Sequence, residues 1–90
     1  MKYVIFKNDR GGLFHPVVFG DHTTHSQVKL EGCHPVSAGF FTQKRDRSVE
    51  VFGKSESLNL ESDPRDAKLV ELMLLNYGTS FFLNYEDMEV

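Results

Sequence analysis

The first extended segment constrains the fold most, because its apolar side chains point to both sides of the backbone. Within residues 2–7, Tyr3 and Ile5 lie on one side of an extended chain, whereas Val4 and Phe6 lie on the other. A strand with one solvated face alternates apolar and polar residues, and this segment does not. We therefore expect residues 2–7 to form a central strand of a sheet.

Three further segments in the first half of the chain have the pattern of strands. They are residues 13–19, 35–42 and 48–53. Residues 8–12 are a dense turn signal, which predicts a hairpin between the first two strands. Pro16 cannot donate a ladder hydrogen bond, so it predicts an edge strand or a bulge. Residues 44–47 are predicted to form the turn between the third and fourth strands.

Two segments are predicted to be helical. The first is short and spans about residues 23–31, with Gly32 as a suitable C-terminal cap. Its possible N-caps are Asp21, Thr23 and Thr24. The second spans residues 65–76, with Pro64 near its first position and Asp66 in its first turn. Its possible N-caps are Ser62 and Asp63, and Gly78 is expected to end it.

The remaining signals complete a mixed fold. A last strand is predicted over residues 81–85, and the alternation at 58–60 indicates either a short extra strand or a loop attached to the core. The element order is therefore ββαββαβ. It predicts an α+β fold in which a small antiparallel sheet of four to five strands carries two helices on one face. With 90 residues, the chain is expected to form a single domain over 1–90.

A histidine-rich stretch raises the possibility of a metal site. His22 and His25 lie three residues apart and would share a helix face, and His15 and Cys33 could complete a tetrahedral zinc site. However, no Cys-x-x-Cys or His-Glu-x-x-His spacing is present. Structural roles are therefore favoured, and we expect no metal and no cofactor. Cys33 precedes His34, but adjacency in sequence does not create a catalytic cysteine–histidine pair. No catalytic residues are predicted.

A basic turn follows two phenylalanines. Lys44, Arg45 and Arg47 are the densest group of cations, and Phe40 and Phe41 stand just before them. Basic and aromatic side chains on one sheet can bind single-stranded nucleic acid. A general nucleic-acid-binding protein, however, needs an excess of positive charge, whereas this chain has a formal net charge of −3. Nucleic acid is therefore an alternative partner and not the expected one.

The charge is unevenly distributed along the chain. Residues 1–54 carry eight basic and five acidic side chains, whereas residues 55–90 carry two basic and eight acidic ones. The acidic half could face a basic partner or stay solvated. No apolar run approaches the roughly 18 residues of a membrane span, and the N-terminal residues do not resemble a signal peptide. With its single cysteine, the chain is expected in the cytoplasm.

The second helix has more apolar surface than one sheet face can cover. Most of its apolar residues form one broad arc, but Leu72 and Leu75 lie outside the centre of that arc. Such a surplus indicates a contact with a protein partner or a second copy of the chain, or burial beneath residues 58–60. The acidic residues expected at such an interface are Glu71, Glu86 and Asp87.

Several short sequence blocks resemble a family of short uncharacterised proteins from bacteria and their phages. The blocks occur at residues 1–6, 16–19, 25–26, 36–40, 55–60 and 63–67. The resemblance implies a small cytoplasmic protein and no functional residues. We expect a non-enzymatic protein-binding module, of the kind that phages use to inhibit a host or defence complex. The alternatives are a zinc-binding or metal-dependent protein and a single-stranded nucleic-acid-binding module.

Overall fold

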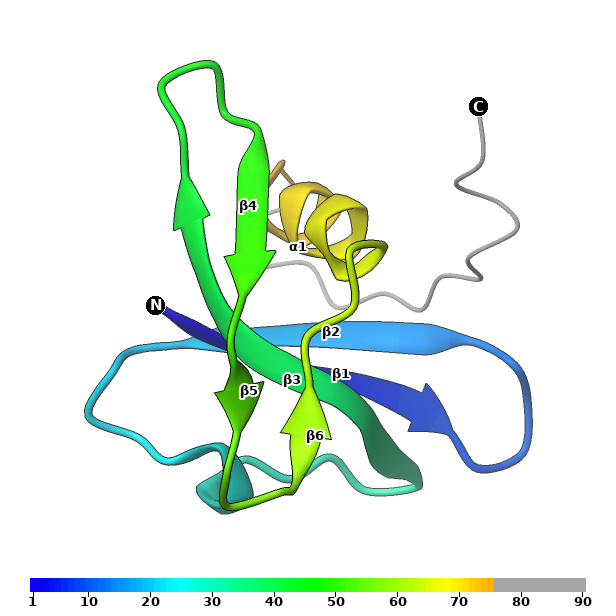
Figure 1. Ribbon diagram of the computed structural model, residues 1–90. Coiled ribbons are helices and arrows are strands. Elements are labelled where there is room, and N and C mark those ends of the chain that lie inside the picture. Colours follow the sequence, from blue (N-terminus) through cyan, green and yellow to red (C-terminus); the bar gives the residue numbers. More distant parts are fainter. Residues whose placement is uncertain (76–90) are drawn as a thin grey trace.

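The computed structural model describes residues 1–75 (Figure 1). The elements, in chain order, are β1 (Lys2–Asn8), β2 (Phe14–Phe19), the 3-10 turn η1 (His25–Gln27), β3 (Cys33–Gln43), β4 (Val49–Phe52), β5 (Lys54–Ser55), β6 (Leu60–Glu61) and α1 (Asp66–Leu75). The fold of these residues is α+β, as the sequence predicts, and within residues 1–75 it has one α-helix and one 3-10 turn where two helices were predicted. The strand predicted over 81–85 and the predicted helix end at Gly78 lie outside the described residues.

The main sheet has four antiparallel strands in the order β2-β1-β3-β4. β1 is therefore central, as its two apolar sides predict, and its residues Tyr3 to Phe6 are at most 2% exposed. β2 is an edge strand, which confirms the prediction from Pro16. The turn predicted at residues 8–12 joins β1 to β2, and the Asn8 amide donates to the Leu13 carbonyl across it.

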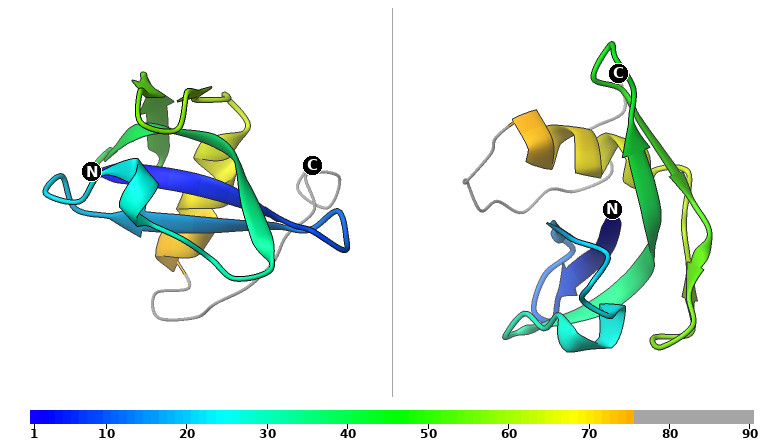
Figure 2. Two further views of the ribbon diagram at one scale, coloured as in Figure 1. Left: turned by 90° about the horizontal axis from the view of Figure 1, so that it is seen from below. Right: turned by 90° about the vertical axis from the view of Figure 1, so that its left-hand side faces the viewer.

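Both faces of the sheet are covered. Tyr3 and Ile5 pack with Leu69 and Val70 of α1 on one face, which we call the helix face. On the opposite face, which we call the second face, Val4 and Phe6 pack with Ala38. Side chains from segments without regular secondary structure and from the β5–β6 hairpin also pack there. Figure 2 shows α1 and the β5–β6 hairpin on different sides of β3. The predicted arrangement, with two helices on one face, is not confirmed within residues 1–75, where α1 is the one α-helix.

The segment predicted as the first helix is mostly irregular, and its Thr24 and Val28 have extended backbones. Only His25–Gln27 forms a 3-10 turn, at whose start the Thr24 amide donates to Gln27 Oε1 at 2.7 Å. Val28 and Leu30 both pack on the second face. Two residues that are two positions apart share a side of extended chain, whereas they diverge on a helix. Burial of this pair therefore favours an extended backbone over the predicted helix.

The β5–β6 hairpin resolves the two alternatives for residues 58–60. It contains two paired strands of two residues each, and its Leu58 and Leu60 pack on the second face. Gly53 has a φ of +75°, and it directs the chain from β4 into β5. The segment is thus both a short strand pair and a loop that is attached to the core.

The start of α1 is held by a network of hydrogen bonds. Asp63 Oδ1 accepts from the Arg65 amide, and the Asp63 amide donates to Asp66 Oδ2 at 3.0 Å. This reciprocal pattern confirms Asp63 as the cap. The Tyr3 hydroxyl also donates to Asp66 Oδ2, at 2.7 Å, and Asp66 is completely buried. α1 then crosses the sheet and contacts both edge strands, β2 and β4. It is too short to cross a membrane, and no other helix is found within residues 1–75.

Gly39 marks a close approach of the chain in the centre of β3. A Cβ atom at this position would lie 2.7 Å from the Phe52 carbonyl oxygen and 3.1 Å from Ser62 Cβ. We expect Gly39→Ala to lower the free energy of unfolding by about 1–3 kcal/mol, because backbone must move to admit the methyl group. Urea unfolding measures the change. Gly20→Ala is the matched control, since nothing lies within 4 Å of its added Cβ. Equal losses in the two variants would contradict the prediction.

The cap of α1 predicts a pH dependence. The Arg65 side chain, by hydrogen bonding, holds the pKa of Asp63 below its ordinary value. A lowered carboxyl pKa adds stability above the unfolded pKa of about 3.9, and this contribution is lost as the pH falls further. We expect Asp63→Asn to be less stable than wild type by about 0.5 kcal/mol at pH 6–7. The gap should close below pH 4 in urea unfolding, and a gap that widens there would refute the assignment.

Candidate functional site

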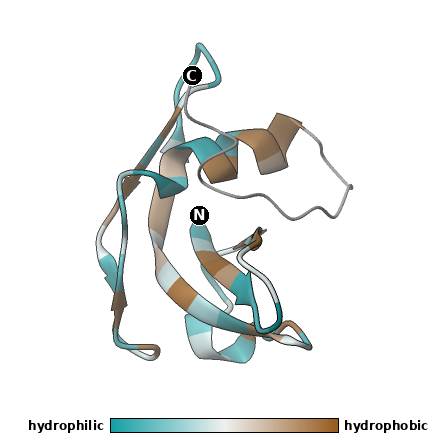
Figure 3. Ribbon diagram, turned by 90° about the vertical axis from the view of Figure 1, so that its right-hand side faces the viewer, coloured by the Kyte–Doolittle hydropathy of each residue, from teal (hydrophilic) through white to brown (hydrophobic). Residues whose placement is uncertain are grey.

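The outer side of α1 carries the exposed apolar residues that the sequence predicts. Leu75 is 63% exposed, and Leu72, three residues before it, is half-buried. Residues three apart lie on the same side of a helix. Leu69 and Val70 are completely buried on the helix face, so the inner stripe is already filled. Figure 3 shows that α1 becomes more hydrophobic toward its C-terminal end.

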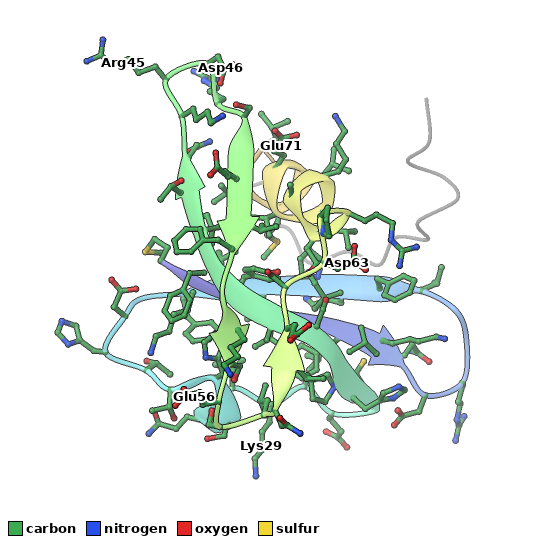
Figure 4. All side chains as sticks on the ribbon, viewed as in Figure 1. Lys29, Arg45, Asp46, Glu56, Asp63 and Glu71 are labelled. Atoms are coloured by element: carbon green, nitrogen blue, oxygen red, sulfur yellow. The ribbon has the colours of Figure 1, made fainter. Side chains whose placement is uncertain are left out.

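The acidic residues predicted for the same interface differ from Leu75 in their surroundings. Glu71 is half-buried, and its Oε1 accepts a hydrogen bond from the Val49 amide at 2.9 Å. The Lys68 ammonium lies 3.8 Å from its other oxygen. Glu71 therefore binds the backbone of edge strand β4, and its carboxylate is already engaged (Figure 4). Glu86 and Asp87 lie outside the described residues.

The histidines and the cysteine do not converge. His15 is buried on β2, His22 is exposed, and His25 is buried in η1. Within residues 1–75, no group of three potential metal-binding side chains is close enough to hold an ion. His34 is exposed, and its Nδ1 lies 2.6 Å from Asp9 Oδ1. The zinc site considered from the sequence is therefore not assembled in this part of the chain.

Cys33 has the environment of a weak nucleophile. It is half-buried at the border of the second face, and burial raises the pKa of its thiol. The nearby charge of Asp9 raises this pKa further. Because the thiolate is the reactive form of cysteine, a raised pKa lowers reactivity at neutral pH. This environment favours a packing role for Cys33.

The basic turn lies at the far end of the β3–β4 hairpin. Arg45 points away from the body of the molecule in Figure 4, and Lys44 lies 3.4 Å from the Glu50 carboxylate. Arg47 is exposed and adopts a φ of +71°. Of the two preceding phenylalanines, Phe41 is buried in the core and only Phe40 is partly accessible. The predicted basic and aromatic cluster is therefore divided.

An aromatic row crosses the second face of the sheet, and sequence reasoning missed it. Strand register places Phe19 opposite Lys2, Lys2 opposite Phe40, and Phe40 opposite Phe52. Residues opposite one another share a face, so the three phenylalanines and Lys2 form a line across all four strands. We call this line, with Lys2 included, the aromatic row. Phe40 and Phe52 stack with centroids 5.9 Å apart, and Phe52 is 47% exposed. No sequence motif predicts the aromatic row, because only the register of the four strands brings its residues together.

His25 closes the inner part of the aromatic row. Its ring meets Phe19 and Phe40 edge-on, with centroids 5.5 and 5.6 Å apart. Its Nε2 lies 2.9 Å from the Gly39 carbonyl oxygen. A carbonyl can only accept, so Nε2 carries a proton and donates. His25 is thus fixed as a wall and is not free to bind a metal through Nε2.

A cavity of about 420 Å³ opens beside this wall. It is lined by Lys2, Thr24, His25, Phe40, Lys54, Glu56 and Ser57. Lys2 Nζ lies 6.0 Å from the Phe40 centroid and donates to the Thr23 carbonyl at 3.0 Å. We call this cavity the Phe40 cavity. It combines an aromatic wall with two ammonium groups and one carboxylate.

Comparison with protein-family models, curated proteins and solved structures found no match to the chain. The resemblance of the short blocks to a bacterial and phage family therefore stays a prediction.

The environment of Cys33 predicts its rate of alkylation. We expect iodoacetamide to modify the folded protein several times more slowly at pH 7.5 than the urea-unfolded protein, because burial keeps the thiol protonated and less accessible. Mass spectrometry follows the modification. Asp9→Asn should speed the folded reaction, since it removes a charge that disfavours the thiolate. Equal rates in the folded and unfolded states would show that Cys33 is an open nucleophile.

Proposed function

We propose that this protein is a non-enzymatic protein-binding module whose partner packs on the outer, C-terminal end of α1. The observation that carries the proposal is the 63% exposure of Leu75 beside the half-buried Leu72. An exposed leucine gains about 1.5–3 kcal/mol when it is fully buried. A partner with an apolar patch would realise this gain. The partner is a second protein chain, and a second copy of this chain is one such partner.

The hydrogen bonds of Glu71 refine what the partner must offer. Because the Glu71 carboxylate already binds Val49 and Lys68, it supplies little charge to a contact. The described part of the interface is therefore mainly apolar. An inhibitor that acts by occupying the surface of a host protein would work in this way, since it needs a docking surface and no reaction chemistry.

Leu75 provides the cleaner test, because Leu72 is also part of the packed protein. We expect Leu75→Lys to abolish association while leaving the urea midpoint almost unchanged, as for other substitutions of exposed side chains. Native mass spectrometry of the full chain, purified gently from its own host, reads both dimers and retained companions. Leu13→Lys is the matched control, because Leu13 is 43% exposed on the β1–β2 turn.

Three outcomes would contradict the proposal. A wild-type protein that is monomeric and carries no stoichiometric companion has no partner at this surface. Association that survives Leu75→Lys would place the interface elsewhere. A Leu75→Lys variant that unfolds like a core variant would show that Leu75 belongs to the interior of the fold.

A further inference from the structure

The Phe40 cavity has one wall suited to a flat ring. Phe40 is flanked by Phe52, which stacks with it at an interplanar angle of 21°, and by His25, which meets it edge-on. Hydrogen bonding to Gly39 fixes His25, and strand pairing fixes Phe40. A rigid aromatic wall binds planar rings without first paying an ordering cost. Nucleobases stack on aromatic side chains of this kind, because every base has a flat π-face.

Two lysines in the cavity lining could bind the anionic part of a ligand. Lys2 is held by the Thr23 carbonyl, which takes one of the three donors of its ammonium group. Lys54 reaches the cavity from β5, and within residues 1–75 it forms no ion pair with a carboxylate. The hydroxyl-bearing residues Thr24 and Ser57 stand in the same lining. Lysines and hydroxyl groups are common ligands of phosphate.

The balance of charge limits the size of the anion. Glu56 is the one carboxylate in the lining, so the two lysines leave a small positive excess. Residues 1–75 carry ten basic and ten acidic side chains, which gives no broad field for a long polyanion. The cavity volume of about 420 Å³ lies in the usual range of small-molecule sites, about 300–1,000 Å³. The site therefore fits one ring and one phosphate.

We propose that the Phe40 cavity is a nucleotide-binding site. The base lies against Phe40, whose ring stacks on that of Phe52 outside the cavity lining, and the phosphate lies between Lys2 and Lys54. This site is on the opposite face of the sheet from α1, so it is independent of the protein-binding surface. The shared chemistry is a nucleotide unit, which can be free in solution or part of a single strand.

The experiment titrates the full-length, isotope-labelled protein at low salt with AMP, adenosine and an RNA hexamer of adenylates. We expect saturable amide shifts with AMP, centred on the residues of the cavity, and weaker binding of adenosine because it lacks the phosphate. A hexamer that matches AMP in affinity and in salt dependence identifies a free nucleotide as the ligand. A hexamer that binds more tightly, with a steeper salt dependence, identifies a single strand.

Two variants that neutralise charges of opposite sign distinguish specific from non-specific binding. Lys54→Gln should weaken AMP binding by about fivefold, and Glu56→Gln should strengthen it by a similar factor. Lys29→Gln is the control, because it removes the same charge at an exposed position outside the cavity lining (Figure 4). Phe40→Leu keeps an apolar side chain and removes the flat ring from the cavity lining, so it should weaken binding by about fivefold.

Several results would overturn the proposal. One is the absence of saturable binding of both AMP and the hexamer to wild type. Another is equal binding of adenosine and AMP, which would remove the phosphate from the site. Unchanged affinity in both Lys54→Gln and Phe40→Leu, with the amide spectrum showing intact folds, would also refute it.

Discussion

The hydrogen bond from Tyr3 to Asp66 connects the two layers of the molecule, and the position of α1 depends on it. A completely buried carboxylate is tolerated only where donors surround it, and Asp66 receives the Tyr3 hydroxyl and the Asp63 amide on one oxygen. The same carboxylate therefore completes the helix cap and fastens the helix to the central strand. Beyond this start, Leu69 and Val70 pack against Tyr3 and Ile5 and hold α1 on the sheet. Leu75 follows Asp66 by about two and a half turns, and there the helix meets solvent.

Much of the fold could be predicted because local signals and tertiary demands agree. The two apolar sides of residues 2–7 predict a central strand, Pro16 predicts an edge strand or a bulge, and Ser62 or Asp63 is predicted to cap the last helix. The prediction failed where the chain is ordered by packing alone. Val4 and Phe6 must be buried on the second face. Segments without regular secondary structure and a short hairpin pack on them there, where a helix was predicted. Two-residue strands are too short to show a period, so no sequence pattern could distinguish them from loops.

The parts of the candidate site that depend on local helix geometry could be predicted from the sequence. The parts that depend on contacts between distant segments could not. Helical periodicity alone places Leu75 outside the buried arc, and the structure confirms its exposure. Periodicity could not assign Glu71, because its role depends on the Val49 amide of an edge strand distant in sequence. The aromatic row was beyond reach for the same reason. Its members come from four strands, and a shift of one residue in register would send them to the opposite face.

The two proposed surfaces have one cause. A sheet has two faces to cover, and a chain this short has few residues outside the sheet with which to cover them. On the helix face, a single helix fills the core with its inner stripe and leaves its last turn outside. On the second face, short irregular segments cover Val4 and Phe6 but stop beside Phe40, which leaves a cavity. Because the sheet separates the two surfaces, a partner on α1 does not occlude the cavity. A charge placed at Leu75 should therefore leave nucleotide affinity unchanged, and a change in Lys54 should leave protein association unchanged, since no described contact links the two positions.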